Sequence, residues 1–323
     1  MRQEAEMIHG DRLSREYIEN ELKSAEISLK VEVREEISST STGLRQYAEA
    51  GEVQDMLLLA EYQTGGRGRK GRSFYSPKGT GLYMSLLLHP GAPAGEVHML
   101  TTLAAAAVAK ALEKVSQKET RIKWVNDILV DGKKVVGILT ETAGTLTDGC
   151  FDYVIVGIGI NVYEPVGGFP EEIRDVAGAV FSGEDVQAAG SSVTTEPENE
   201  SRIQKENAGI RDNCGSDQQN FRSRIAAETI KQFMEYYKVF PQKSYLEEYR
   251  SRSFLIGKEV RIIPTEQMLG SVAEAERATG REGNKDVIYA TVLGIDEQCR
   301  LQVRYEDGRE DFLSNGEVSV RER

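Results

Sequence analysis

The stretch from Arg121 to Glu141 constrains the fold more than any other part of the chain. Two short apolar runs in it flank the dipeptide Asp131-Gly132, and Asp-Gly is among the strongest local signals for a two-residue β-hairpin turn. Side chains alternate between the two faces of a strand, so the first run should place Lys123 and Asp127 on one face. The pattern predicts an antiparallel hairpin that gathers polar side chains around one place: Lys123, Asn126, Asp127 and Lys134.

A second segment predicts a glycine-rich loop between two strands. It follows the apolar run Met56 to Ala60 and leads into the apolar run Tyr83 to Leu88. Glycines allow close approach of the backbone to a ligand, and guanidinium groups bind phosphate or carboxylate oxygens. An exposed basic loop is the plain alternative. The density of glycine and the acidic background of the chain favour an anion-binding loop, formed by Gly66, Arg67, Gly68, Arg69, Lys70, Gly71 and Arg72.

A third segment, Val154 to Val162, reads as a buried strand that is interrupted by Gly157 and Gly159 and closed by Asn161. Glycine inside a strand usually marks a place where a ligand or another backbone comes close. A tight crossing in the core is the alternative. Together with the hairpin and the loop, this strand favours a binding site.

Composition limits the classes of function. At 323 residues the chain has room for two domains, and its formal charge of −12 opposes a nucleic-acid partner. No apolar run approaches the length of a membrane span, and the polar residues 1–11 do not resemble a secretory signal. The scattered cysteines are typical of a reducing cytoplasm, and neither they nor the histidines have metal-ligand spacing: Cys150, Cys214, Cys299, His9, His89 and His98.

Further segments complete the expected organisation. A helix is predicted over residues 11–26, a strand over 29–37, an alanine-rich helix over 97–115 and a helix over 225–249. Short strands are predicted at 260–263, 289–295, 301–305, 311–313 and 318–321. Ser38 to Thr42 stands at a predicted helix start, where the hydroxyls of Ser39 and Thr40 are expected to cap open backbone N–H groups.

The order of these motifs resembles the biotin–protein ligases. The resemblance covers residues 30–180 and resumes at the C-terminal end, where the chain looks like the small terminal barrel of that family. It is carried by Ser39-Thr40-Ser41, Gln63, the loop Gly66–Arg72, Lys123-Trp124-Val125-Asn126-Asp127, Lys134–Gly137, Gly157–Asn161 and Gly316–Arg321.

The resemblance implies an α+β fold, with a mixed or antiparallel sheet and flanking helices, as in the class II synthetase-like catalytic domain of biotin and lipoate ligases. A small SH3-like barrel should follow it. The expected domains are an N-terminal helical segment at 1–28, the catalytic domain at 29–255 and the barrel at 256–323. Polar insertions are expected at 183–220 and 266–285. The first segment is too short for the winged helix of the repressor members, so the chain is expected to be of the short, non-repressor type.

The implied activity is the ATP-dependent ligation of biotin to a lysine of a carrier domain, through biotinyl-5′-AMP. The implied partners are biotin, Mg-ATP and the biotin carboxyl carrier domain of a carboxylase, with no tightly bound cofactor, no DNA and no membrane, in a monomer or homodimer. A lipoate–protein ligase and a non-catalytic biotin sensor remain as alternatives.

The resemblance also assigns roles to residues. Lys134, Arg69 and Lys123 should act on the reacting groups, and Asp127 should contact the nucleotide through Mg²⁺. Biotin should be bound by Ser39, Thr40, Ser41, Gln63, Gly66, Arg67, Arg69, Lys134 and Gly137. The nucleotide should be bound by Arg67, Arg69, Arg72, Phe74, Lys123, Asn126, Asp127, Gly157, Gly159, Asn161 and Arg321. Ser38 and Ser41 depart from the aspartate and asparagine that are common in the family.

Overall fold

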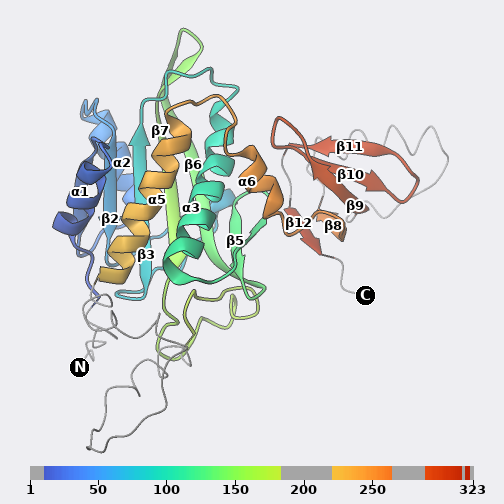
Figure 1. Ribbon diagram of the computed structural model, residues 1–323, viewed down its shortest axis with the longest axis horizontal. Coiled ribbons are helices and arrows are strands. Elements are labelled where there is room, and N and C mark those ends of the chain that lie inside the picture. Colours follow the sequence, from blue (N-terminus) through green and yellow to red (C-terminus); the bar gives the residue numbers. More distant parts are fainter. Residues whose placement is uncertain (1–10, 183–219, 264–287, 315–316, 321–323) are drawn as a thin grey trace, which may run out of the picture.

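The computed structural model describes residues 11–182, 220–263, 288–314 and 317–320. Two sheets and a set of helices make up this part of the chain, and the smaller sheet lies beyond one edge of the larger one (Figure 1). Apart from residue 220, the insertion predicted at 183–220 lies outside the described residues, as does the one predicted at 266–285.

The larger sheet has seven strands in the order β1-β2-β3-β7-β6-β5-β4. The first two strands pair in parallel and all other neighbours are antiparallel, which confirms the predicted mixed sheet. The strands are β1 (Lys30–Arg34), β2 (Met56–Ala60), β3 (Gly81–Leu88), β4 (Arg121–Lys123), β5 (Asp127–Val130), β6 (Lys133–Thr147) and β7 (Cys150–Asn161).

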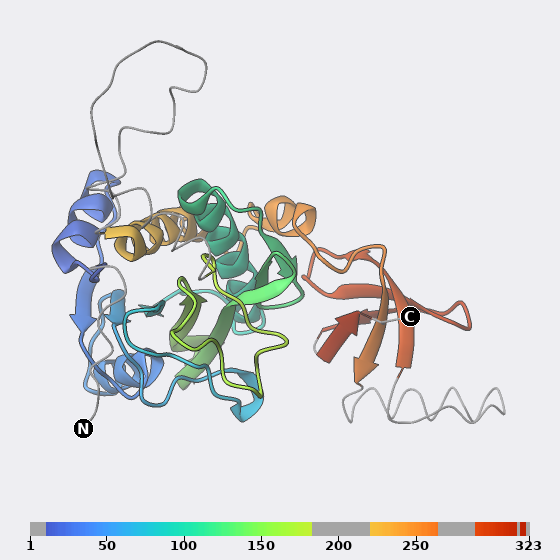
Figure 2. The same cartoon turned by 90° about the horizontal axis from the view of Figure 1, so that it is seen from below.

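Helices cover the two faces of this sheet unequally. Helices α1, α3 and α5 lie side by side on one face, whereas α2 lies on the other face, with the loops that connect the strands (Figure 2). The helices are α1 (Arg15–Ser24), α2 (Thr40–Glu49), α3 (Leu100–Ser116), α5 (Phe221–Tyr237) and α6 (Leu246–Ser251), with short 3-10 turns at η1 (Arg69–Gly71) and η2 (Val97–Met99). The face that carries fewer helices leaves room for a site.

The hydrophobic core follows this division. The alanines of α3 let it approach the sheet closely, and Ala104 to Ala107 are fully buried there with leucines and valines of the strands. A second, smaller cluster fills the space under α2, around Leu44 and Leu58. Burial of apolar surface on both faces stabilises the sheet as the rigid frame of the molecule.

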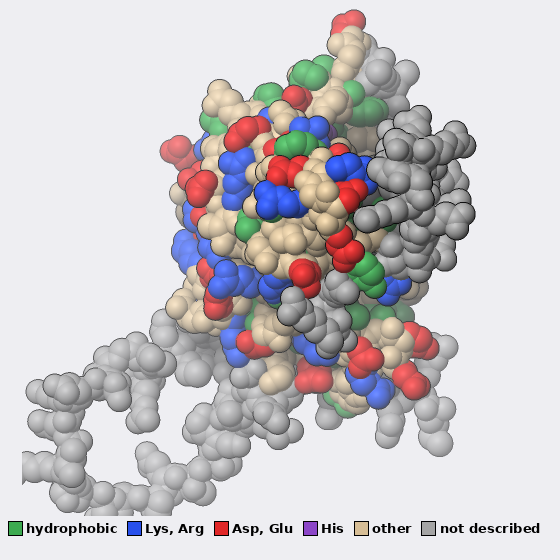
Figure 3. Space-filling model, turned by 90° about the vertical axis from the view of Figure 1, so that its right-hand side faces the viewer, with side chains coloured by type: hydrophobic (Ala, Val, Ile, Leu, Met, Phe, Trp, Pro, Cys, Tyr) green, Lys and Arg blue, Asp and Glu red, His purple; other side chains and the backbone are tan. Residues whose placement is uncertain are grey.

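The C-terminal sheet, as we call the smaller one, is antiparallel with the strand order β11-β10-β9-β8-β12. All five strands predicted for the small barrel are present, at β8 (Glu259–Ile263), β9 (Ile288–Ile295), β10 (Leu301–Tyr305), β11 (Glu310–Leu313) and β12 (Glu317–Val320). Positively and negatively charged side chains are interspersed over the end of the molecule that bears this sheet (Figure 3).

Two predicted elements are wrong in detail. The run from Arg121 to Val130 is not one strand, because the chain turns at residues 124–126 and pairs β4 with β5, so that Lys123 lies opposite Asp127. The helix predicted over 225–249 is two helices, because Pro241 lies between α5 and α6, and proline lacks the N–H that a helix interior needs. The turn at Asp131-Gly132 is confirmed, with both residues at positive φ.

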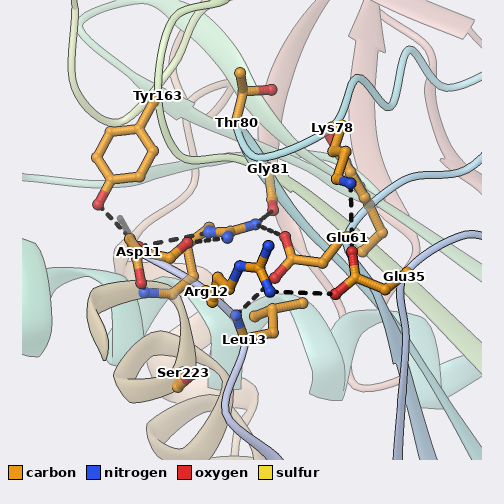
Figure 4. A network of polar contacts seen from close by, with 12 residues as sticks. Asp11, Arg12, Leu13, Glu35, Glu61, Lys78, Thr80, Gly81, Tyr163 and Ser223 are labelled. Carbon is orange, nitrogen blue, oxygen red and sulfur yellow. Dashed lines mark hydrogen bonds and ion pairs between the residues drawn. The ribbon is translucent and has the colours of Figure 1, made fainter. Parts of the chain in front are cut away.

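A buried polar network ties the N-terminal segment to the sheet (Figure 4). The Arg222 side chain is fully buried at the start of α5, where it contacts Glu61 at 2.8 Å and donates to the carbonyl of Gly81 at 2.9 Å. Asp11 accepts from the hydroxyl of Tyr163 at 3.0 Å and from the backbone N–H of Arg222 at 3.1 Å. Burial raises the pKa of Asp11 above its ordinary value, although the Arg222 charge opposes the rise.

No helix within the described ranges is long and apolar enough to cross a membrane.

Candidate active site

A cavity of about 280 Å³ lies on the α2 side of the large sheet. The glycine-rich loop, the turn at 124–126, β6 and β7 all contribute to its walls. Most residues predicted for the site line it: Ser39, Thr40, Ser41, Gln63, Arg67, Arg69, Arg72, Phe74, Lys123, Asn126, Asp127, Lys134, Gly137, Gly157 and Gly159.

Glycines form the floor of this cavity. Gly137 of β6 lies directly opposite Gly159 of β7, and a Cβ atom at Gly159 would come within 2.6 Å of the Phe74 ring. At Gly157 it would come within 2.7 Å of the Ser41 hydroxyl oxygen. These strand glycines are therefore closely approached, but by the side chains of Phe74 and Ser41, whereas the sequence predicted a ligand or another backbone.

A buried network of hydroxyl and amide groups lines one wall. The Gln63 side chain accepts from the Thr40 backbone N–H at 2.8 Å and donates to Ser76 at 3.1 Å. Ser85 lies 2.7 Å from the Thr40 hydroxyl and 3.0 Å from that of Ser41. Each hydroxyl can both donate and accept, so this wall suits a small ligand that carries donors and acceptors side by side.

The predicted capping role of Ser39 is not found. Ser39 stands at the N-cap of α2, but its side chain makes no capping hydrogen bond. The Gln63 amide oxygen instead satisfies the backbone N–H of Thr40, in the first turn. The Thr40 hydroxyl, for which a capping role was also predicted, instead lies within hydrogen-bond distance of Gln63 and Ser85.

The glycine-rich loop is a tight turn whose arginines reach the neighbouring strands. Its two sides pair through the backbone N–H of Phe74, which donates to the carbonyl of Gly66 at 2.9 Å. The Arg67 guanidinium lies 3.0 Å from Glu141 of β6. Arg69 donates to the Asn126 side chain at 3.0 Å, so the loop bridges to the turn at 124–126.

Strands β5 and β6 place a cation and a carboxylate together, next to the turn at 124–126. Asn126 donates to the Ile138 carbonyl at 3.0 Å and so holds the turn against β6. Lys134 of β6 lies 2.7 Å from Asp127 of β5, with both side chains partly exposed to the cavity side. A ligand anion that enters here would meet the Lys134 ammonium next to the loop arginines.

Comparisons with known proteins agree with this geometry. Residues 33–161 match the model of the biotin/lipoate A/B protein ligase family, and residues 277–321 match that of the biotin protein ligase C-terminal domain. The fold is similar to that of a biotin protein ligase from Aquifex aeolicus, solved in complex with biotin and ATP. That comparison gives a TM-score of 0.61 and 26% identity, and covers 91% of this chain and 99% of the other. The chain belongs to the biotin protein ligase family.

The curated relatives of this chain include proteins named as bifunctional ligase/repressors and proteins named as ligases alone. The bifunctional ligase/repressor BirA of Bacillus spizizenii is 39% identical over 181 residues, which is 55% of either chain. A biotin–[acetyl-CoA-carboxylase] ligase of Mycobacterium tuberculosis is 26% identical over 90% of this chain and 88% of the relative. The chain thus matches about half the length of the first of these relatives.

Two described residues that the family resemblance assigns to the site, Gly66 and Asn161, do not line the cavity. Gly66 packs under the loop, where a Cβ atom would come within 2.4 Å of the Phe74 carbonyl oxygen. The Asn161 side chain donates to the carbonyl of Gly178 at 2.9 Å, and so fastens the loop that follows β7. Arg321 lies outside the described residues.

The sequence analysis did not identify two residues of interest, Ser85 in the cavity wall and Glu141, which contacts a loop arginine beside it. Ser85 is fully buried in β3 and joins the hydroxyl network. A serine inside an apolar strand is a signal that could have identified it. Glu141 contacts both Arg45 of α2 and Arg67 of the loop, each at 3.0 Å. No local pattern predicts that contact, because it joins three separate elements.

A resident metal does not fit the residues of the site. Within the described ranges there is no group of three His, Cys, Asp or Glu side chains that could hold a metal ion. Magnesium usually retains several waters and binds one or two carboxylates together with substrate phosphates. Asp127 therefore fits a metal that arrives with the nucleotide and not one that the protein holds alone.

Proposed function

We propose that this protein is a biotin–protein ligase that activates biotin with ATP and transfers it to a lysine of a carrier domain. The observation that carries the proposal is a single cavity in which a buried hydroxyl and amide wall adjoins a cluster of cations over a glycine floor. The wall suits the cyclic urea of biotin, and the cations suit a carboxylate and a phosphate.

The proposed first step joins biotin to AMP. The biotin carboxylate attacks the α-phosphorus of Mg-ATP, and pyrophosphate leaves. Lys134 would neutralise the oxygens that develop charge, and Arg67 and Arg69 would hold the mixed anhydride. Fixed charges of this kind stabilise a transition state without reorganisation. Phe74, on the glycine floor, would cover the product and exclude water.

The proposed second step needs no protein nucleophile. The amine of the acceptor lysine attacks the activated carbonyl, and AMP leaves as the amide forms. Positioning and charge stabilisation account for the rate of such reactions. Asn126 and Lys123 would lie on the nucleotide side, and Thr40, Ser41 and Gln63 on the biotin side. Arg321 would also contact the nucleotide, as the family resemblance implies. A cytoplasmic location would suit a carboxylase partner.

The test is a transfer assay with the full chain, Mg-ATP, an apo biotin carrier domain and either biotin or lipoate. Mass spectrometry should find one biotin on one carrier lysine, with AMP as the co-product. Transfer of lipoate in preference to biotin would favour the lipoate ligase alternative. Binding of biotin without any transfer would favour the sensor alternative.

A further inference from the structure

The single tryptophan of the chain, Trp124, links the turn at 124–126 to the C-terminal sheet. Its indole N–H donates to the backbone carbonyl of Cys299 at 2.9 Å, and only 5% of the residue is exposed. Cys299 lies in the turn between β9 and β10, hereafter the β9–β10 turn, residues 296–300. A buried hydrogen bond therefore joins the two parts of the molecule beside the cavity, which Trp124 itself lines.

The β9–β10 turn is built to present that carbonyl. The Asp296 carboxylate accepts from the backbone N–H groups of Gln298 and Arg300, at 2.9 and 2.8 Å, and from the Arg300 side chain at 2.7 Å. These bonds close the turn and hold Cys299 at a positive φ of 59°. An Asp side chain that bonds to its own turn in this way fixes the local backbone.

The turn is inserted into the catalytic part of the molecule. The Cys299 thiol accepts from Thr102 of α3 at 3.3 Å and lies 3.5 Å from the Tyr245 hydroxyl. Arg250 of α6 donates to the carbonyl of Ile295 at 2.8 Å. Burial raises the pKa of the Cys299 thiol, so the sulfur stays neutral in this contact.

The turn at 124–126 is fastened from both sides. Tyr249 of α6 donates to the carbonyl of Val125 at 3.0 Å, and Asn126 accepts from Arg69 on the cavity side. Trp124 thus anchors a three-residue turn that lines the cavity, with Lys123 and Asp127 paired at its base.

We propose that the β9–β10 turn of the C-terminal sheet positions the nucleotide side of the active site through the hydrogen bond from Trp124 to Cys299. Trp124 is then a positioning residue that acts through Asn126 and Asp127. This inference rests on the proposed function, since it assigns those two residues to ATP. The biotin side does not depend on this contact, because Thr40, Gln63 and Ser85 are held by α2, β3 and one another.

Trp124→Phe tests the donor. The variant keeps an aromatic side chain and removes the N–H, so the Cys299 carbonyl loses its partner. Loss of one buried hydrogen bond that holds the turn should raise the KM for ATP about three- to tenfold in biotin-dependent pyrophosphate exchange, while the KM for biotin changes by less than about twofold. A folded variant with an unchanged KM for ATP overturns the proposal.

Asp296→Ala tests the acceptor side without any change to the cavity or to Trp124. The turn loses its three internal bonds, so the same selective rise in the KM for ATP is expected, with a red shift of the Trp124 emission. Asp307→Ala is the matched control, because Asp307 closes the β10–β11 turn of the same sheet through equivalent bonds to Arg309 at 3.0 and 2.7 Å. It should change neither KM nor the emission.

The double variant Trp124→Phe/Asp296→Ala completes the test. If both changes break one contact, the KM for ATP of the double variant should not exceed that of the more affected single variant. Changes at one shared contact are not additive. Fully additive effects, or equal effects of Asp296→Ala and Asp307→Ala, overturn the proposal. Failure of the proposed function is distinguishable, because then the unaltered protein itself shows no exchange that depends on biotin.

Discussion

Lys134 is the residue whose surroundings best define the chemistry of the cavity. Its ammonium lies 2.7 Å from Asp127, and its backbone N–H donates to the Val176 carbonyl at 2.8 Å, so its strand position is held from both sides. The neighbouring Lys133 points elsewhere and donates to the carbonyl of Asp175 at 2.6 Å. Two adjacent lysines of β6 thus have different environments, which makes them a matched pair.

Lys134→Ala should slow adenylate formation by about 2–4 kcal/mol in barrier, the scale for loss of one preorganised charge stabiliser. Lys133→Ala should leave the rate unchanged, because this side chain lies outside the cavity. Biotin-dependent pyrophosphate exchange measures both. A rate for Lys134→Ala close to that of the unaltered protein would remove this residue from the reaction.

At the scale of elements, the glycine floor depends on strand register. Gly137 and Gly159 meet across β6 and β7, so the Phe74 ring lies over backbone where side chains would otherwise stand. The sequence pattern indicated that something approaches these glycines, and the register decides that it is the Phe74 ring. The turn at 124–126 was not foreseen, because the apolar run around it has the alternation of a continuous strand.

Gly159→Ala should push the Phe74 ring into the cavity, because the new methyl would come within 2.6 Å of it. We expect a loss of about 1–3 kcal/mol in stability, as for other overpacked sites, and a higher KM for ATP. Gly95→Ala is the control, since a Cβ atom there meets nothing within 4 Å. Combining Gly159→Ala with Phe74→Leu should recover stability. If it does not, contact with the ring is not the cause.

At the scale of the whole molecule, a buried ion network and the two sheets determine how distant segments assemble. Arg222 brings together the N-terminal segment, the ends of β2 and β3, and α5. Arg12, drawn in the same view, contacts Glu35 only at 3.9 Å and is mostly exposed (Figure 4). Both arginines contact carboxylates, but only Arg222 is buried and also donates to a backbone carbonyl.

Arg222→Ala should lower the free energy of unfolding by about 3–5 kcal/mol, because it leaves the carboxylates of Asp11 and Glu61 buried without their counter-charge. Arg12→Ala should change stability by less than about 0.5 kcal/mol, as exposed pairs contribute little. Urea unfolding of both variants measures this difference. Equal losses would mean that the buried network does not stabilise the assembly.

Stability should also fall at acid pH because Glu228 of α5 is held as a carboxylate by Lys114 of α3 and by its neighbours on α5. Burial alone would raise the pKa of Glu228, but hydrogen bonds from Lys114 and Gln232 outweigh it, so the pKa is lowered from 4.5. A carboxyl group whose pKa is lower in the folded state stabilises that state at pH values above its pKa in the unfolded chain. This stability is lost as the pH falls through the pKa of the folded state. The raised pKa of Asp11 acts in the opposite direction. Glu228→Gln should therefore flatten the decline in unfolding free energy below about pH 4.5, as measured by urea unfolding at several pH values. An unchanged slope would contradict this role.

Local pattern by itself determined most of the strands, the Asp131-Gly132 turn, the glycine-rich loop and the polar residues of the hairpin, while Gln63 and Phe74 came from the family resemblance. Periodicity and turn chemistry act over a few residues, so they can be recognised along the chain. Tertiary structure decided the pairing of Glu141 with Arg67, the burial of Arg222 and the bond from Trp124 to Cys299. The last of these joins residues 175 positions apart. Contacts of that kind depend on how the sheets and helices pack, and no neighbouring residue in the sequence carries a sign of them.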